Sequence, residues 1–149
     1  KFTDYALRIL VALALTPAAK VPTSQIARLY GLSDHHLSKV ASQLVHNGFV
    51  LSDRGRGGGL RLAQPADAIS IGGVLRALKA DDPVVECFGP DKSCIILPAC
   101  GLRAPLLAAQ EAFFATLDHV MLSDVTAQKS AIAQLLGQIP QSNPSGMAV

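Results

Sequence analysis

The chain has 149 residues, half of them hydrophobic and only 5% aromatic, with no tryptophan. This length predicts one domain, or a small domain with an extension, whose core is packed by leucine, alanine, valine and isoleucine. No apolar run approaches the length of a membrane span, so the sequence offers no candidate transmembrane helix. The formal net charge of +2 is weak evidence for a nucleic-acid partner, and the distribution of the charges matters more.

The first segment, KFTDYALRILVALAL, is predicted to form a helix over residues 2–15, because its apolar residues recur at helical spacing. Asp4 and Arg8 interrupt the apolar run and no clean cleavage site follows it, which argues against a secretory signal peptide. Since the chain begins at Lys1, we expect the natural start to lie slightly upstream. Three cysteines without a secretion signal argue against a disulfide framework, so we expect a cytoplasmic protein.

Two more helices are predicted, separated by a short turn. The first is QIARLY, for which Thr23 or Ser24 is the expected cap and Gly31 the end. The second is DHHLSKVASQLVHN, for which Ser33 is the expected cap and Gly48 the end. Two helices joined by a short, glycine-containing turn are typical of the helix-turn-helix motif, whose second helix reads DNA.

The second helix of this motif is predicted to have an apolar and a polar face. The apolar face, expected in the core, consists of Leu37, Val40, Ala41 and Leu44. The polar, mildly basic outer face consists of His35, Lys39, Ser42 and His46, flanked by Ser38 and Gln43. By itself this face is equally compatible with a plain solvated helix. If the helix reads DNA, the expected base or phosphate contacts are His35, Ser38, Lys39 and Ser42.

A basic hairpin is predicted directly after this motif. The stretch GFVLSDRGRGGGLRLAQP contains two strand-like runs, FVLS and LRLA, around a glycine-rich tip that suits positive φ angles. Arg54 and Arg56 lie on the tip, and Arg61 lies on the returning strand. The pattern is typical of a winged helix whose arginines enter a narrow minor groove. A nucleotide-binding loop is disfavoured, because the G-K-[ST] ending and the G-x-G-x-x-G spacing are missing.

Three helices are predicted in the rest of the chain. Ser70 begins IGGVLRALKA, which is expected to stop before the DDP segment. A long helix is predicted from Cys100 to about Met121, and Ser123 is the expected cap of a last helix, DVTAQKSAIAQLLG. The tail QSNPSGMAV is expected to be disordered.

The long helix is predicted to be apolar on two sides. One side is expected to hold Leu102, Leu106, Phe113, Leu117 and Val120, and the other Leu107, Phe114 and Met121. A helix of this kind needs two surfaces to bury it. We expect one surface to be its own domain and the other to be a second subunit.

All three cysteines lie in one short segment, VVECFGPDKSCIILPACGLR, as Cys87, Cys94 and Cys100. Thiolates suit iron–sulfur clusters, zinc and cuprous copper, and three on one loop can converge on a single centre. A start of the long helix at Cys100 would favour an anionic centre there. Structural zinc, a metal-free thiol redox switch and three unrelated buried cysteines remain alternatives. The positions of the four histidines suggest no fourth ligand.

Three segments carry a resemblance to a known family. They are KFTDYALRIL at the start, GFVLSDRGRGGGLRLAQPADAISIGGVLRAL in the middle, and C-x6-C-x5-C ending in ILPACGLR. In these segments the chain resembles the iron–sulfur winged-helix regulators of bacteria, a group that includes NsrR and IscR. The resemblance covers nearly the whole chain except the tail, and within the group it is greatest to the nitric-oxide-sensing repressors.

The resemblance implies a homodimeric, DNA-binding transcriptional repressor, not an enzyme, with nitric oxide as its effector. It implies a 4Fe–4S cluster, with 2Fe–2S as the alternative, held by Cys87, Cys94 and Cys100. The fourth implied ligand is Asp4, supplied by the other subunit. IscR-type members use a histidine three residues after the last cysteine, and Arg103 stands at that position here, which argues against an IscR-type site.

Within that resemblance, the recognition helices would enter successive major grooves of a near-palindromic operator, with Arg54 and Arg56 in the adjacent minor grooves. One alternative is a regulator that senses iron–sulfur status or redox state through a 2Fe–2S cluster, zinc or thiols. Another is an electron-transfer protein or an enzyme, for which the sequence shows no nucleophile–base constellation and no paired catalytic carboxylates.

The expected fold class is mainly α with a small β-hairpin, arranged as a winged helix-turn-helix domain plus a long dimerisation helix. The expected division of the chain is a DNA-binding domain over residues 1–82, a cluster-binding loop over 83–101, dimerisation helices over 102–138 and a disordered tail over 139–149.

Overall fold

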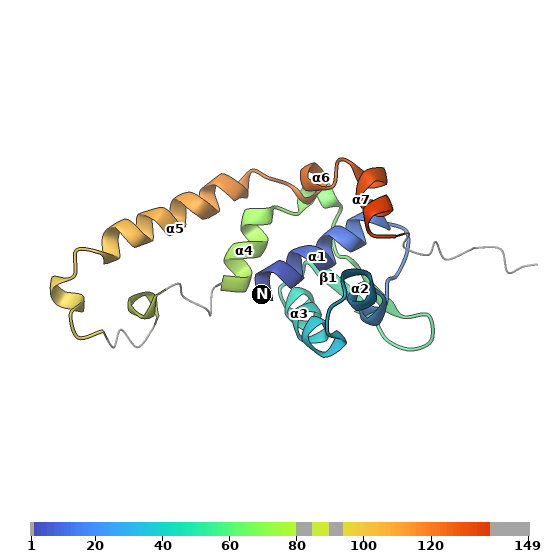
Figure 1. The fold of residues 1–149 in the computed structure, drawn as a ribbon, viewed down its shortest axis with the longest axis horizontal. Coiled ribbons are helices and arrows are strands. Elements are labelled where there is room, and N and C mark those ends of the chain that lie inside the picture. Colours follow the sequence, from blue (N-terminus) through green and yellow to red (C-terminus); the bar gives the residue numbers. More distant parts are fainter. Residues whose placement is uncertain (1, 80–84, 90–93, 138–149) are drawn as a thin grey trace, which may run out of the picture.

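The computed structural model describes residues 2–79, 85–89 and 94–137 (Figure 1). Its α-helices are α1 (Phe2–Leu15), α2 (Thr23–Tyr30), α3 (Asp34–His46), α4 (Ile71–Lys79), α5 (Arg103–Asp118), α6 (Leu122–Val125) and α7 (Lys129–Leu135). The strands are β1 (Val50–Asp53) and β2 (Gly59–Leu62), and the 3-10 turns are η1 (Ala66–Ala68), η2 (Glu86–Phe88) and η3 (Leu97–Ala99). The predicted mainly helical, winged-helix fold class is confirmed. The DDP helix stop and the tail lie outside the described residues.

The core of the winged helix forms around α1, which packs against α2, α3, β2 and α6. The buried face of α3 consists of Leu37, Val40, Ala41 and Leu44, each at most 4% exposed, as predicted. The most deeply buried large side chains of α1 are Ile9, Leu10 and Leu13. Burial of one such side chain contributes about 1.5–3 kcal/mol, so this core positions the helix-turn-helix firmly.

At the ends of α2 and α3, the position of a glycine predicted a helix end correctly, whereas the predicted side-chain caps are not formed. Gly31 ends α2 in the left-handed conformation with φ of 62°, as predicted. Thr23 begins α2 after Pro22, without a side-chain cap bond, so capping by Thr23 or Ser24 was wrong. Ser33 holds the expected N-cap position of α3 but makes no cap hydrogen bond. The helix ends at His46, two residues before Gly48.

The hairpin that forms the wing is anchored to the loop before α2. β1 and β2 pair antiparallel, and Val21 and Leu60 exchange backbone hydrogen bonds of 2.9 and 2.8 Å. A Cβ at Gly59 would lie 2.8 Å from the Val21 carbonyl carbon, so only glycine permits this approach. At the tip, Gly55 and Gly57 have φ angles of 94° and 76°, which confirms the expected positive values.

A backbone joint connects the start of α4 to the chain after α5. Ser70 Oγ accepts a hydrogen bond from Gly73 N at 3.1 Å and so caps α4, which agrees with the predicted helix start at Ser70. Ser70 Oγ also donates to the Asp118 carbonyl at 2.8 Å, and Ile71 N donates to the Val120 carbonyl at 2.8 Å. From this joint α5 runs away from the winged helix toward the cysteine segment (Figure 1).

The predicted limits of the C-terminal helices need correction. Cys100 is not the start of a helix, because it lies at the C-terminal end of the 3-10 turn η3. The helix α5 begins at Arg103 and ends at Asp118. The last predicted helix is divided into α6 and α7. Ser123 lies inside α6, because Asp124 accepts the backbone N–H of Met121 at 2.8 Å and fixes the helix start there.

The apolar residues of α5 divide differently from the prediction. Phe114 is buried, and Leu117 and Val120 pack partly buried against the same core. The prediction had grouped Leu117 and Val120 with Phe113, but Phe113 points to solvent and is 57% exposed. The expectation that one apolar side meets its own domain holds, and that side is formed by Phe114, Leu117 and Val120.

Within the described ranges, no helix combines the length and apolar character that crossing a membrane requires.

Candidate nucleic-acid interface and cysteine segment

The outer face of α3 presents polar and basic side chains to solvent. The four predicted DNA contacts, His35, Ser38, Lys39 and Ser42, are all exposed. Ser42 Oγ donates to the Ser38 carbonyl at 3.0 Å, so the same oxygen is still available as an acceptor. Because the opposite face of α3 is buried, this is the only side of the helix that a duplex can approach.

The wing carries two kinds of arginine. Arg54 and Arg56 at the tip are exposed and take part in no ion pair among the described residues. Arg61 on β2 faces Asp53, with its Nε 3.8 Å from the carboxylate. The tip therefore presents uncompensated guanidinium groups, which suits a narrow groove of negative potential.

Asp53, the last residue of β1 before the wing tip, is paired with cations, a feature that the sequence did not reveal. Lys20 Nζ lies 2.8 Å from Asp53 Oδ2. The hydrogen bond from Lys20, with the attraction of Lys20 and Arg61, holds the pKa of Asp53 below its ordinary value. Asp53 therefore stays ionised at neutral pH and anchors the wing to the loop before α2, consistent with the bridge between Val21 and Leu60.

The three cysteines are free and each is partly buried. Cys87 lies in η2, while Cys94 and Cys100 flank η3. In the described part of this single chain, no three or more histidine, cysteine, aspartate or glutamate side chains come together as a metal site. The donor chemistry of three thiols fits a soft metal centre, although the described residues do not gather all three into one site.

Arg103, where an IscR-type site would have histidine, contacts the cysteine segment in a different way. Its Nε donates to the Cys87 carbonyl at 3.4 Å, and its guanidinium lies 6.0 Å from the ring centre of Phe88. Arg103 thus ties η2 to the first turn of α5. A guanidinium has no lone pair for a metal, so Arg103 cannot act as a ligand in place of that histidine.

Asp4 lies exposed on the first turn of α1. Arg8 Nε is 3.2 Å from Asp4 Oδ2, and the Arg8 guanidinium also lies 5.4 Å from the ring centre of Tyr30. Burial raises the pKa of Tyr30, and the charge of Arg8 opposes that shift. Among the residues that the structure describes, Asp4 has only this exposed ion pair, which is a weak restraint.

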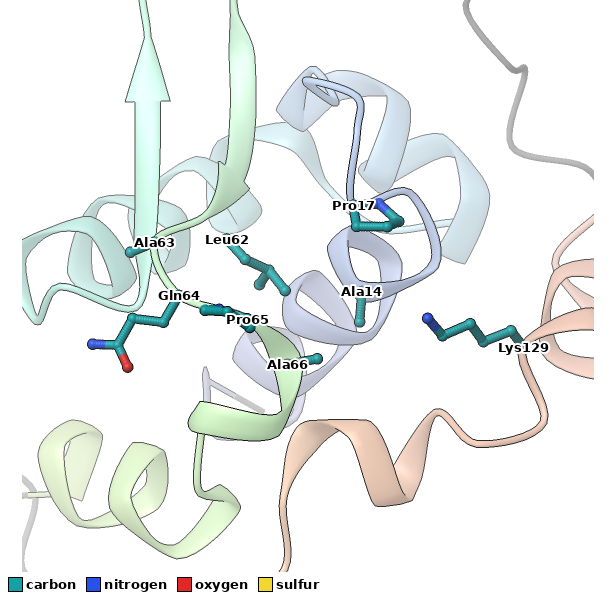
Figure 2. Close-up of a pocket in the computed structure, with 8 residues that line it drawn as sticks. All are labelled: Ala14, Pro17, Leu62, Ala63, Gln64, Pro65, Ala66 and Lys129. Carbon is teal, nitrogen blue, oxygen red and sulfur yellow. The ribbon is translucent and has the colours of Figure 1, made fainter.

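A cavity of about 440 Å³ lies between the end of α1, the base of the wing and α7. Figure 2 shows its lining residues, which are Ala14, Pro17, Leu62, Ala63, Gln64, Pro65, Ala66 and Lys129. Lys129 is the one titratable side chain in this lining. The cavity contains none of the predicted site residues and offers no acid–base pair.

The chain matches one family over most of its length. The sequence profile of the Rrf2 family, described as an iron-dependent transcriptional regulator, matches residues 1–128. The HTH-type transcriptional regulator NsrR of Bacillus subtilis (strain 168) is 42% identical over 137 residues, covering 91% of this chain and 94% of the relative. The protein of the same name from Geobacillus kaustophilus (strain HTA426) is 39% identical over 137 residues, covering 91% and 93%.

Solved structures have the same fold. CymR (YrzC), the global cysteine regulator of B. subtilis, has a TM-score of 0.66 at 29% identity, covering 86% of this chain and 95% of that chain. T. potens IscR has a TM-score of 0.66 at 23% identity, covering 86% and 85%, which supports the fold alone. The profile match and the similarity to these relatives show that this chain belongs to the Rrf2 family of transcriptional regulators.

Proposed function

We propose that this chain is a homodimeric, DNA-binding transcriptional repressor whose affinity for its operator is controlled by an iron–sulfur cluster that reacts with nitric oxide. The relatives at 42% and 39% identity are named HTH-type transcriptional regulator NsrR, and the family profile is described as iron-dependent. These names support a transcriptional regulator, while the metal, the signal and the ligand residues are part of the proposal.

DNA binding is assigned to the outer face of α3 and the tip of the wing. His35, Ser38, Lys39 and Ser42 are exposed on the one face of α3 that the core leaves free. Arg54 and Arg56 lie at a glycine-rich tip that is uncompensated by described acids. A recognition helix in the major groove and a basic wing in the minor groove would use both surfaces.

The cluster ligands are assigned to Cys87, Cys94 and Cys100, with the partner subunit's Asp4 as the fourth. The thiols are free and partly buried, and thiolates are the donors that iron–sulfur clusters require. The carboxylate of Asp4 is exposed, so another chain can reach it once Arg8 releases it. When bound, a four-iron cluster with three thiolates supplies one iron without protein sulfur, which is the natural target for nitric oxide.

The observation that carries this proposal is the place of the cysteine segment in the fold. The segment joins α4, whose Val74 and Leu75 are buried in the winged-helix core, to α5, which projects from that core (Figure 1). A group bound by this segment therefore acts on the connection between the DNA-reading domain and the projecting helix. Local events of this kind switch regulators when they bias an element with two arrangements.

The test is anaerobic purification followed by visible absorption, iron and sulfide analysis, and nitric oxide titration. The DNA probe is a duplex selected by the protein from a random-sequence pool. We expect iron and sulfide in equal amounts, and a change in duplex affinity of about tenfold or more after nitric oxide. Cys94→Ala is expected to lose the cluster, and the cluster-free wild-type protein provides the reference affinity.

The variant Asp4→Asn tests the fourth ligand independently of the three cysteines. We expect this variant to keep part of its iron and sulfide but to respond differently to nitric oxide, while Asp67→Asn, another exposed aspartate, behaves as wild type. A normal response in Asp4→Asn refutes the ligand role of Asp4. Selection of no duplex, or an affinity that ignores the cluster and nitric oxide, refutes the proposed function.

A thiol redox regulator is the second candidate, because the described part of the single chain gathers no metal site from its three free thiols. It predicts protein without iron or sulfide whose duplex affinity changes on mild oxidation and recovers with a reducing agent. Zinc content in the same preparation distinguishes a structural metal from both cases.

A further inference from the structure

Arg76 forms the most extensive polar contact in the described part of the molecule. From α4 it donates to both carboxylate oxygens of Glu111 on α5, at 2.8 and 2.6 Å. It also donates to both oxygens of Asp118 at the end of α5, at 3.1 and 2.8 Å. Its guanidinium lies 5.0 Å from the ring centre of Phe114. One side chain of α4 thus contacts two turns of α5.

The contact is well matched in charge and geometry. The hydrogen bonds from Arg76 hold the pKa values of Glu111 and Asp118 below their ordinary values, so both carboxylates are ionised at neutral pH. A guanidinium donates in a planar fork that fits two carboxylates at once, whereas a lysine has one nitrogen. The side chains are partly exposed, so the contact fixes orientation more than it adds stability.

The helices α4 and α5 meet at a fixed point close to this contact. Ser70 and Ile71 are hydrogen-bonded to the carbonyls of Asp118 and Val120. A Cβ at Gly72 would overlap Asp118, so the two backbones touch there. From this joint the helices diverge in Figure 1, and Arg76 spans them beyond the joint, where it limits how far they open.

The cysteine segment is attached to the ends of the two helices that point away from the joint. It leaves the C-terminal end of α4 at Lys79 and enters α5 at Arg103. Arg103 also holds the Cys87 carbonyl from the first turn of α5. The segment therefore connects the free ends of the two helices. Arg76 stands between those ends and the joint, and α4 is packed into the winged helix through Val74 and Leu75.

We propose that Arg76 is a positioning residue that couples the state of the cysteine segment to DNA binding, by holding α4 at a fixed angle to α5 through Glu111 and Asp118. The proposal rests on the proposed function and deepens it. With Arg76 in place, a rearrangement of the cysteine segment turns α4, and with it α3 and the wing, as one body. Without Arg76, the angle between α4 and α5 is no longer fixed, so a rearrangement of the cysteine segment does not change the affinity for DNA.

The experiment measures coupling separately from cluster binding. Wild type, Arg76→Gln, Arg76→Lys and Glu111→Gln are prepared in cluster-loaded and cluster-free forms. Each form is assayed for iron and sulfide per chain, thermal unfolding, and affinity for the selected duplex. The coupling is the ratio of the two affinities. Lys129→Gln and Asp67→Asn are matched controls, because both side chains are exposed and neither is in an ion pair among the described residues.

We expect Arg76→Gln to keep the wild-type iron and sulfide content. Its coupling ratio is expected to be roughly five- to tenfold closer to one than the wild-type ratio. Arg76→Lys and Glu111→Gln, which each retain part of the contact, are expected to fall between wild type and Arg76→Gln. If Arg76→Gln does not fold, these two variants carry the test. Both controls are expected to keep the wild-type ratio.

Two results overturn the role of Arg76. One is a wild-type coupling ratio in folded Arg76→Gln or, should that variant not fold, in both partial variants. The other is a loss of coupling in Arg76→Gln that is accompanied by a matching loss of iron. That result would mean that Arg76 helps the protein to hold the cluster and does not transmit its state. A wild-type ratio of one instead refutes the proposed function itself and the coupling with it, so the two failures are distinguishable.

Discussion

At the scale of single residues, Arg56 and Arg61 lie five positions apart but have different surroundings. Arg56 is at the glycine-rich tip with no described ion pair, while Arg61 faces Asp53. The charge of Arg61 is already partly compensated by that carboxylate. The local environment therefore decides which guanidinium groups of the wing are available to phosphates.

This difference gives a prediction for salt dependence. Replacing Arg54 or Arg56 with glutamine is expected to weaken duplex binding and to reduce the slope of log affinity against log salt by about one, because each removes one phosphate or groove contact. Arg61→Gln is the matched control and is expected to change the slope less. Fluorescence anisotropy over a salt series measures both. Equal slopes for all three variants contradict the assignment of DNA contact to the tip.

At the scale of elements, two adjacent glycines at the start of α4 make a matched pair. Gly72→Ala is expected to destabilise the fold by about 1–3 kcal/mol, because its Cβ would overlap Asp118 at the α4–α5 joint. Gly73 has only Ser70 side-chain atoms at 3.5 and 3.6 Å, so Gly73→Ala is expected to be neutral or to stabilise by up to ~1 kcal/mol.

Urea unfolding of both variants tests the prediction. If Gly72→Ala is as stable as Gly73→Ala, the two helices do not approach each other as closely as described. The loaded and cluster-free affinities of Gly72→Ala also report whether the joint matters for signalling. Loss of the joint should reduce coupling as loss of Arg76 does, since both set the angle of α4.

The elements also show what the sequence could and could not predict. The buried face of α3, the end of α2 at Gly31 and the glycine-rich wing tip follow from local spacing and backbone conformation, and the structure agrees. The contact of Arg76 with Glu111 joins positions 35 residues apart on different helices, which no local pattern encodes. The position of the α6 start, with Met121 as the N-cap, depends on Asp124, which lies three residues later and accepts the backbone N–H of Met121. The prediction had placed the cap at Ser123.

The cysteine segment marks the limit of sequence reasoning at the site. The spacing of the thiols predicts a soft metal centre, and their free, partly buried state is compatible with one. In our proposal, their convergence depends on the cluster and on the partner subunit's Asp4. On that proposal, one chain does not contain all of the atoms that determine the geometry of the site, so neither its sequence nor its fold alone fixes that geometry.

At the scale of the whole molecule, α5 leaves an apolar surface without a described partner. Phe113 and Leu102 are 57% and 60% exposed, on the helix and its N-cap that project from the winged helix (Figure 1). Exposed aromatic and aliphatic side chains on one projecting element are typical of a protein interface. A second copy of the chain placed there would bring two winged helices together, as a near-palindromic operator requires.

Phe113→Glu is therefore expected to raise the dimer dissociation constant by more than about tenfold, because a charge would replace a buried aromatic contact. Leu135→Gln is the control, since Leu135 is 88% exposed but lies on α7, away from α5. Sedimentation equilibrium over a concentration series measures the association, and duplex affinity should fall with it, because a monomer reads only one half-site. A Phe113→Glu protein that remains dimeric, with normal unfolding, places the subunit interface on another surface and removes the basis for sharing a cluster between chains through α5.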